Sequence, residues 1–372
     1  MEQPTLDVTG DWPMIAAQLP TDWREIAVRH HLVDPTLPAY MRTKITDVEQ
    51  ALRLMLYHVG TDTSLATTVA VGKAARIVDI SAVALHHWMR KSGPFLYDLL
   101  ARLVDAEQTF RAERWAGYDI HVVDASCVER PGAKGTTARV HYALRLTTLR
   151  PVHIEITDEH GGETFRRFRV RPDELWMGDR GYANPPGIAH VTDAGGEVMV
   201  RLNRGALPLY DVHGRPLDLH RCWQRLRRSG PPRQWFAQVQ PEGHAPIRGR
   251  LCMVRLPDDR ADEARERLRR EQGAPLSADA KEAAAFVMVF TTVPDERLTT
   301  AQVLELYALR WQVELSIKRD KSICGLGRLP HFRPDAIATW LGAKLLLIQI
   351  ARRLLSPQVA FPPGARTDRA AA

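Results

Sequence analysis

The apolar pattern of this 372-residue chain changes near residue 118. Before this point apolar residues recur at helical spacing, for example over residues 47–59 and 95–103. From residue 118 onward they form short β-branched or aromatic runs separated by turn-forming residues. The change predicts an all-helical N-terminal domain over residues 1–115, with an α/β domain after it. The length also exceeds one typical core, which favours more than one folding unit.

The second part of the chain has the element order of a mixed α/β sheet. We expect strands over residues 118–123, 140–147, 151–157, 174–177 and 197–202, with a helix over 186–194. Three strands, a break, a strand, a helix and a strand predict a mixed sheet over residues 116–204. Residues 205–295 interrupt this order with further strand candidates, and we interpret them as a β-rich insertion.

Two helices are expected over residues 299–321 and 334–355, within a segment 296–355 that completes the α/β domain. Residues 356–372 are rich in Pro, Ala and Arg, a composition typical of disorder.

The predicted helix 299–321 presents five chemically active side chains on one face. Glu314 lies at the centre, and Tyr307, Arg310, Lys318 and Lys321 lie seven or four residues away along the chain. At about 100° per residue, the five fall within an arc of about 80°. Such a stripe suits phosphodiester chemistry, because the carboxylate can bind a metal ion while the cations hold phosphate oxygens. The alternative is that Arg310 and Lys318, each four residues from Glu314, form surface salt bridges with it.

Two more acids are predicted at the C-terminal ends of strands. Asp124 follows the apolar run 121–123, and Asp179 follows Gly178 at the end of the strand 174–177. Acids at such strand ends lie at the rim of the sheet, where ligands bind in open α/β folds. Either could instead be a turn former or a helix cap. Together with Glu314 they would suffice to hold two hard cations about 3.5–4 Å apart for an in-line displacement.

Composition agrees with a polyanionic partner but does not require one. The formal net charge is +7 and the pI is about 9.4. The four cysteines are scattered, with no C-x-x-C pair, which favours reduced thiols in the cytoplasm. The most apolar stretch, 341–350, is short and contains Lys344, so no membrane association is expected.

A helix–turn–helix candidate is found in the N-terminal part. Residues 65–76 and 81–90 are the two predicted helices, and Ser81 is the expected cap of the second. The second helix would present His87, Arg90 and Lys91 to DNA. The alternative is an ordinary helical hairpin with a polar face.

These residues together resemble the DDE transposases of bacterial insertion sequences, in the insertion-sequence-four-like branch marked by Y-x2-R-x3-E-x6-K. Tyr307-x2-Arg310-x3-Glu314-x6-Lys321 matches that signature completely, and Lys318 fills a further basic position. The motifs VVDAS at 122–126 and GDRGY at 178–182 are similar to the two aspartate motifs of the family. The resemblance covers residues 75–350.

The resemblance implies a ribonuclease-H-like catalytic fold interrupted by the insertion 205–295. It implies that Asp124, Asp179 and Glu314 are both the catalytic residues and the ligands of Mg²⁺, with Mn²⁺ as a substitute. The implied phosphate contacts are made by Tyr307, Arg310, Lys318, Lys321 and Arg180. Phe286 takes the position of a base-stacking aromatic residue, although a place in the core of its own strand is an equally good interpretation.

The implied function is cut-and-paste transposition. Each element end is hydrolysed, and the freed 3′-hydroxyl then attacks target DNA. Expected partners are double-stranded DNA with terminal inverted repeats, target DNA and a second copy of the chain in the DNA complex. The chain departs from well-studied members in having little beyond Leu355, so pairing would use other surfaces or the DNA itself, or the copy is truncated. The alternatives are a nuclease or resolvase without strand transfer, and a catalytically silent DNA-binding regulator.

Overall fold

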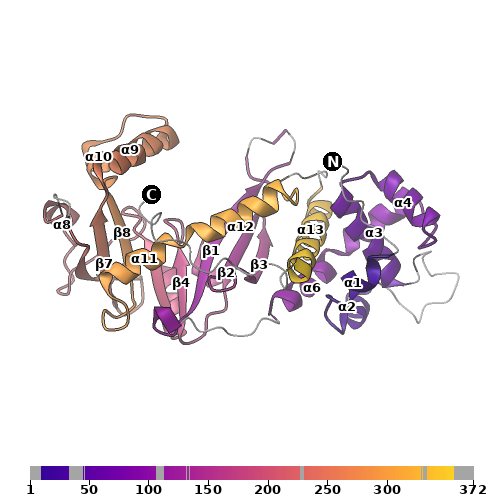
Figure 1. The fold of residues 1–372 in the computed structure, drawn as a ribbon, viewed down its shortest axis with the longest axis horizontal. Helices are drawn as coiled ribbons and strands as arrows, with labels where there is room; N and C mark the ends of the chain where they lie inside the picture. Colours follow the sequence, from indigo (N-terminus) through magenta and orange to yellow (C-terminus); the bar gives the residue numbers. More distant parts are fainter. Residues whose placement is uncertain are drawn as a thin grey trace.

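The computed structural model describes residues 10–32, 45, 47–105, 113–130, 132–133, 135–226, 230–327, 329 and 333–355. The predicted disordered tail, 356–372, lies outside the described residues. Figure 1 shows an elongated molecule with a β-sheet in its middle and a bundle of helices at one end.

One eight-stranded sheet organises most of the chain. Its strands are β1 (Asp119–Val128), β2 (Ala138–Arg145), β3 (Pro151–Thr157), β4 (Glu174–Gly178), β5 (Glu197–Arg201), β6 (Arg233–Val239), β7 (Ile247–Arg255) and β8 (Phe286–Thr291). Their spatial order is β3-β2-β1-β4-β5-β8-β7-β6. β1, β4 and β5 are parallel to one another, and the other neighbours are antiparallel. The mixed α/β sheet expected from the sequence is thereby confirmed, including α7 (Pro185–Asp193) between β4 and β5.

Residues 205–295 add three strands to this same sheet. β8 pairs with β5, and β7 and β6 follow outward. The segment also contains α8 (Leu219–Gln224), α9 (Asp258–Gln272) and α10 (Ala278–Ala283). Its strands therefore extend the sheet formed by β1–β5. The division into domains stays a prediction.

The regular elements among the described residues before 113 are helices joined by turns. Its helices are α1 (Trp12–Ala16), α2 (Trp23–Arg29), α3 (Val48–Thr61), α4 (Leu65–Ala74), α5 (Ala82–Lys91) and α6 (Gly93–Asp105). Ser81 caps α5 by accepting a hydrogen bond from the Ala84 amide at 3.1 Å, as the sequence predicted. A short 3₁₀ turn, Glu113–Trp115, precedes β1; another, Phe165–Arg167, lies between β3 and β4.

The helix expected over residues 299–321 is divided in two, so that prediction was wrong in one respect. The structure has α11 (Thr300–Ala308) and α12 (Trp311–Ser322), followed later by α13 (Pro334–Leu355). At the junction the amides of Leu309, Arg310, Gln312 and Val313 each bond a carbonyl three residues back, at 3.0–3.1 Å. These 3₁₀-type hydrogen bonds replace the α-helical ones at the junction. They change the rotation about the helix axis between Tyr307 and the residues that follow it. The capping box at Thr299 and Gln302 confirms the expected start of the element.

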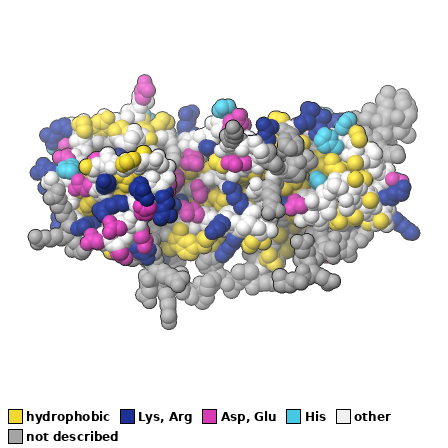
Figure 2. Space-filling model, turned by 90° about the horizontal axis from the view of Figure 1, so that it is seen from above, with side chains coloured by type: hydrophobic (Ala, Val, Ile, Leu, Met, Phe, Trp, Pro, Cys, Tyr) yellow, Lys and Arg dark blue, Asp and Glu magenta, His cyan; other side chains and the backbone are white. Residues whose placement is uncertain are grey.

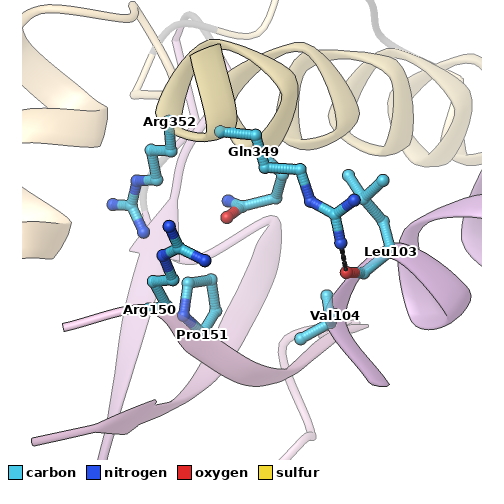
Figure 3. A pocket seen from close by; sticks show the side chains of 7 residues that line it. Leu103, Val104, Arg150, Pro151, Gln349 and Arg352 are labelled. Atoms are coloured by element: carbon cyan, nitrogen blue, oxygen red, sulfur yellow. Dashed lines mark hydrogen bonds between the residues drawn. The ribbon is translucent and has the colours of Figure 1, made fainter. Parts of the chain in front are cut away.

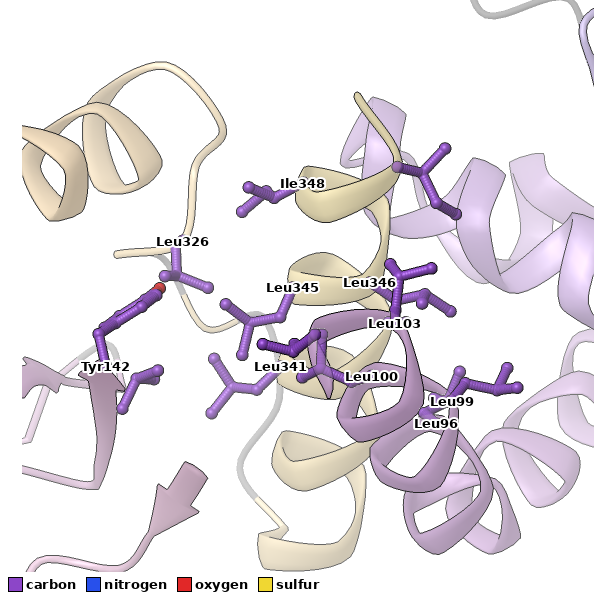
Figure 4. Packing of buried hydrophobic residues seen from close by; sticks show 14 of the residues in the cluster. Leu96, Leu99, Leu100, Leu103, Tyr142, Leu326, Leu341, Leu345, Leu346 and Ile348 are labelled. Atoms are coloured by element: carbon purple, nitrogen blue, oxygen red, sulfur yellow. The ribbon is translucent and has the colours of Figure 1, made fainter. Parts of the chain in front are cut away.

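The long apolar helix α13 joins the helical bundle to the sheet. Figure 4 shows its leucines packed against Leu96, Leu99, Leu100 and Leu103 of α6 on one side. On the other side Leu341 and Leu345 face Tyr142 of β2. Both sides belong to one continuous core. Among the helices that the structure describes, none combines the length and the hydropathy that a membrane span requires.

The two faces of the sheet belong to different cores. Ile120 and Val122 of β1 pack in the same core as Leu306 and Ile317 of α11 and α12. Val123 belongs to the second core, on the opposite face. Side chains alternate between faces along a strand, so every residue of β1 can be assigned to one of them.

Candidate functional site

Asp124 and Asp179 lie side by side on neighbouring parallel strands. Val122 is registered with Met177, so two residues further along each chain Asp124 stands opposite Asp179. The side chains of Asp124 and Asp179 lie on the same face of the sheet as those of Val122 and Met177, because side chains alternate between faces along a strand. Helices α11 and α12 pack against this face. The carboxylates therefore emerge on the same face.

One detail of the sequence interpretation was wrong. Asp124 does not end its strand: β1 continues to Val128, because Ala125–Val128 pairs with β2 over residues 138–141. The registered pairs with β4 stop at Val122, however. Asp124 thus lies where β1 runs on past its parallel neighbour, which leaves it at the rim of the β1–β4 pair.

Helix α12 brings Glu314 to this face. α12 packs against β1, and Val313 and Ile317, which flank Glu314 along the helix, belong to the core beneath it. The preceding helix is held by Tyr307, whose hydroxyl donates to the carbonyl oxygen of Gly178 at 3.3 Å. Glu314 itself is exposed on its outer side. The signature helix and the strand before Asp179 are therefore bonded to each other directly.

The three carboxylates act on one another electrostatically. The pKa of Asp124 is raised to about 7, mainly by burial and also by the negative charges of Asp179 and Glu314, whereas the Ala125 amide and Arg310 lower it. A proton or a cation would relieve this repulsion. Carboxylate oxygens that repel one another at a sheet rim are the donor set that a hard divalent cation prefers.

A fourth carboxylate adjoins them, and the sequence interpretation did not include it. A Cβ atom placed on Gly181 would lie 1.7 Å from Oε2 of Glu163 and 3.2 Å from Oδ1 of Asp179. The two oxygens therefore flank the same point beside the glycine. Burial raises the pKa of Glu163, and the charge of Asp179 raises it further. The lack of a side chain at Gly181 is what lets Glu163 approach. This contact joins segments 16 residues or more apart, and no local motif signals it.

The cations of the signature differ in what they contact. Arg310 forms an ion pair with Glu314 and is largely buried. Lys318 is exposed, and the structure gives it no ion pair with a described residue. Lys321 donates to the carbonyl oxygen of Cys127 in β1 at 2.7 Å. The salt-bridge interpretation of the stripe therefore applies to Arg310, which pairs with Glu314. It does not apply to Lys318, which is exposed to solvent.

The base-stacking interpretation of Phe286 does not fit the structure. Phe286 is only 4% exposed and stacks on Trp223, with ring centroids 6.0 Å apart. It lies in the second core, the alternative considered from the sequence. A flipped base could reach it only if the ring left that core.

The helix–turn–helix candidate presents part of the predicted DNA-reading surface. His87 and Lys91 are exposed on α5. Arg90 instead pairs with Asp335 at the start of α13, with Nε 2.5 Å from Oδ2. Arg90 thus links the helical bundle to the last helix.

Arg180, the remaining predicted DNA contact, follows Asp179 directly in the chain and is exposed.

A second group of possible ligands lies elsewhere, and its two carboxylates already have hydrogen-bond donors. Ligand atoms of Asp119, His121 and Glu174 fall within 4.8 Å of one another. Arg145 donates to both oxygens of Asp119, at 2.8 and 3.1 Å, and Trp176 donates to Glu174 at 3.0 Å.

This group also occupies the other end and the other face of β1 and β4, since Trp176 belongs to the second core. The two carboxylates face opposite nitrogens of the imidazole. We interpret the group as a buried ion-pair cluster rather than a metal site.

The small pocket in Figure 3 is also separate from the carboxylates. It lies between the ends of α6 and α13 and the start of β3, and its volume is about 20 Å³. This is room for one water molecule. Figure 2 shows acidic and basic side chains interspersed on the face seen from above, so charge is not segregated there.

Comparison with known proteins identifies similar chains. A family model described as "Transposase DDE domain" matches residues 115–350. The transposase for insertion sequence element IS421 of Escherichia coli is 28% identical over 331 residues, covering 87% of this chain and 89% of the relative. The putative transposase InsL for insertion sequence element IS186A of Escherichia coli (strain K12) is 27% identical over 330 residues, with the same coverage.

Proposed function

The chain belongs to the family of DDE-domain transposases, and we propose that it is a cut-and-paste transposase whose catalytic residues are Asp124, Asp179 and Glu314. The observation that carries this assignment is the register that sets Asp124 opposite Asp179 on the face covered by α12. The family membership expected from the Tyr307–Lys321 signature is confirmed.

The same carboxylates would hold Mg²⁺, or Mn²⁺ in its place. Carboxylate oxygens are the ligands that such a hard cation prefers, and the pKa of Asp124 is raised first by burial and then also by the negative charges of Asp179 and Glu314. Bound there, the ions would activate the attacking oxygen and stabilise the leaving oxygen of an in-line displacement. Glu163 lies close enough to Asp179 to support the same ion directly or through water.

The protein's own groups bind and orient the DNA. Arg310 holds the Glu314 carboxylate by its ion pair and partly offsets its charge. Lys318 and Arg180 are exposed beside the acids and would contact backbone phosphates. Tyr307 and Lys321 donate to backbone carbonyls of β4 and β1, so they would position the helix that bears Glu314. The substrate is double-stranded DNA with terminal inverted repeats, and the ends are joined to a target by a pair of transposases.

The test is cleavage of a donor plasmid that carries the element's own ends, with Mg²⁺ or Mn²⁺. Asp124→Asn, Asp179→Asn and Glu314→Gln should each lower cleavage by at least about 10³-fold while leaving DNA binding intact, because each removes a charge needed to hold the metal ions. Normal cleavage by any of these variants would overturn the assignment.

Strand transfer is tested separately with pre-cut ends that bear a free 3′-hydroxyl. A transposase joins such ends to target DNA. Cleavage without joining would instead support a nuclease or resolvase. Specific binding with neither activity would support a catalytically silent regulator.

A further inference from the structure

Glu163 is an acid beside the proposed metal site that has no bonded partner of its own. It lies in the segment between β3 and β4. Within the described part of the chain, its carboxylate makes neither a hydrogen bond nor an ion pair, and Arg139 acts on it only through space. The nearby charge that acts on it most is negative and belongs to Asp179. Two like charges placed together cost free energy unless a cation joins them.

Gly181 provides the space in which this carboxylate approaches Asp179. A Cβ atom placed on Gly181 would lie 1.7 Å from Oε2 of Glu163 and 3.2 Å from Oδ1 of Asp179. The separation of the two oxygens is therefore smaller than the sum of these distances. Oxygen ligands of one Mg²⁺ lie about 3–4 Å apart, because each Mg–O bond is about 2.1 Å long. The arrangement thus allows the two carboxylates to share one ion.

The backbone of Gly181 does not itself require glycine. Its φ angle lies outside the left-handed region that side chains rarely adopt. Its amide donates to Oδ1 of Asp179 at 2.8 Å, a bond that alanine could also make. What the glycine provides is room for the Glu163 carboxylate.

The loop that carries Asp179 also fixes the backbone of Glu163. The Asn184 side-chain amide donates to the carbonyl oxygens of Glu163, at 3.4 Å, and of Tyr182, at 3.3 Å. Asn184 is held in turn as the N-cap of α7, where it accepts from the Gly187 amide at 2.9 Å. Segments before and after β4 therefore hold Glu163 and Asp179 beside each other.

A buried hydroxyl group without a partner lies near the same acids. Tyr182 is fully buried, and its hydroxyl has no hydrogen-bond partner among the described residues. Burial raises the pKa of Tyr182 most, and the negative charges of Glu163, Asp124 and Asp179 raise it further. Buried hydroxyl groups nearly always have a partner, and a water molecule bound to an ion at these acids would supply one.

We propose that Glu163 is a fourth carboxylate ligand of the metal centre and binds the same divalent cation as Asp179. The inference rests on the proposed function, since the cation is one that Asp124, Asp179 and Glu314 would hold. A shared Mg²⁺ or Mn²⁺ relieves the repulsion between the Glu163 and Asp179 carboxylates. The charges of four carboxylates also balance those of two divalent cations.

The test measures Mn²⁺ binding by the full chain on a DNA duplex that carries a pre-cut element end. Electron paramagnetic resonance counts the free Mn²⁺ during the titration. Glu163→Gln should weaken Mn²⁺ binding about 10–100-fold, because metal affinity falls by this factor even when only a group that supports a ligand is lost. Half-maximal cleavage of intact ends should require correspondingly more Mg²⁺.

Glu159→Gln is the matched control. It removes the same charge from the same segment, but Glu159 is exposed. Its Mn²⁺ affinity should equal that of the wild type. Wild-type Mn²⁺ affinity in Glu163→Gln would overturn the proposal.

Gly181→Ala tests the same contact without changing any charge. The alanine Cβ would displace the Glu163 carboxylate, which is the flexible end of its side chain, so the fold should tolerate the change. Mn²⁺ binding should weaken by a similar factor, and combining Gly181→Ala with Glu163→Gln should add little. Fully additive losses would show that the alanine does not act through Glu163, and would count against the proposed contact.

A purely structural role for Glu163 predicts a different result. In metal-free protein, Glu163→Gln should unfold at the wild-type temperature or higher, because the change removes repulsion from Asp179. A lower melting temperature of the metal-free variant, with wild-type Mn²⁺ affinity, would show that Glu163 supports the fold and not the metal centre.

The outcome is separable from that of the proposed function. Wild-type Mn²⁺ affinity in Glu163→Gln, with Asp124→Asn unable to cleave, would remove Glu163 from the metal centre and leave the transposase assignment standing. Weaker Mn²⁺ binding by Glu163→Gln, in a protein that never cleaves or joins its ends, would retain the fourth ligand and remove the assignment.

Discussion

The ammonium group of Lys321 donates a hydrogen bond to the carbonyl oxygen of Cys127 at 2.7 Å. This bond ties α12 to β1 only three residues beyond Asp124, and on the same helix as Glu314. A residue expected from its family motif to contact DNA therefore links the two elements that carry Asp124 and Glu314, two of the proposed catalytic acids. The neighbouring Lys318 is exposed and could bind phosphate. Substitutions of Lys321 and of Lys318 can therefore test the positioning of α12 and phosphate binding separately.

Lys321→Met should lower the free energy of unfolding by about 1–2 kcal/mol, because it removes a charged donor and leaves a carbonyl without its partner. Lys318→Met should change it by less than about 0.5 kcal/mol, as is usual at exposed positions. Urea denaturation measures both. In DNA binding Lys318→Met should have the larger effect. Only this variant should lower the slope of log affinity against log salt concentration. Equal stability of the two variants would contradict the positioning role of Lys321.

Tyr307→Phe should act on stability more than on DNA affinity. The Tyr307 side chain is buried, and its hydroxyl bonds the Gly178 carbonyl. Removing one neutral hydrogen bond costs about 0.5–1.5 kcal/mol. Thermal unfolding gives the stability change, and a salt-controlled binding assay gives the affinity. A large loss of affinity with an unchanged melting temperature would show that the hydroxyl contacts phosphate instead.

The pKa of Asp124 predicts a pH-dependent stability in the absence of divalent metal. The folded protein keeps this proton up to about pH 7, whereas the unfolded chain loses it near the ordinary value of 3.8. Between these values the folded state binds more protons, so the free energy of unfolding should fall as pH rises. The loss should be on the order of 1–4 kcal/mol.

Asp124→Asn is the control for this effect, because it lacks the titrating carboxyl group. The difference in unfolding free energy between the two proteins should grow from pH 5 to pH 8. Mg²⁺ should reduce it at the upper end by offsetting the carboxylate charges. A difference that does not vary with pH would contradict the assignment of the raised pKa to Asp124.

Phe286→Ala should destabilise the protein by about 3–5 kcal/mol, the usual cost of removing a buried aromatic ring. The ring stacks on Trp223 in the core of the sheet. Phe286→Leu keeps most of the volume and should restore much of the stability and all of the cleavage. Loss of cleavage in a stable Phe286→Leu protein would return the ring to a role at the DNA.

Much of the architecture was predictable because its signals are local. The strands β1–β5 and helix α7 were found from runs of β-branched residues and their bounding turns, within a few residues of their observed limits. The cap of α5 at Ser81 and the capping box at Thr299 are also encoded over a few residues.

The errors came from interactions that no short window contains. Asp124 was placed at the end of its strand because the apolar run stops there, but pairing with β2 carries β1 on to Val128. The α11–α12 break at Leu309 is formed by backbone bonds that residue types do not reveal. The pairing of Arg90 with Asp335, 245 positions away, is another contact outside any short window; the contact of Arg90 with DNA stays a prediction.

The sequence by itself determined the family and much of the element order, and it predicted the three acids, since the spacing from Tyr307 to Lys321 and the flanking strand motifs are properties of residue order. Only the tertiary structure decided how these residues are used. Register sets Asp124 opposite Asp179, packing buries Phe286, and a backbone carbonyl accepts a hydrogen bond from Lys321. Each of these depends on which distant segments meet, and such contacts follow from the packing of the whole chain rather than from local propensity.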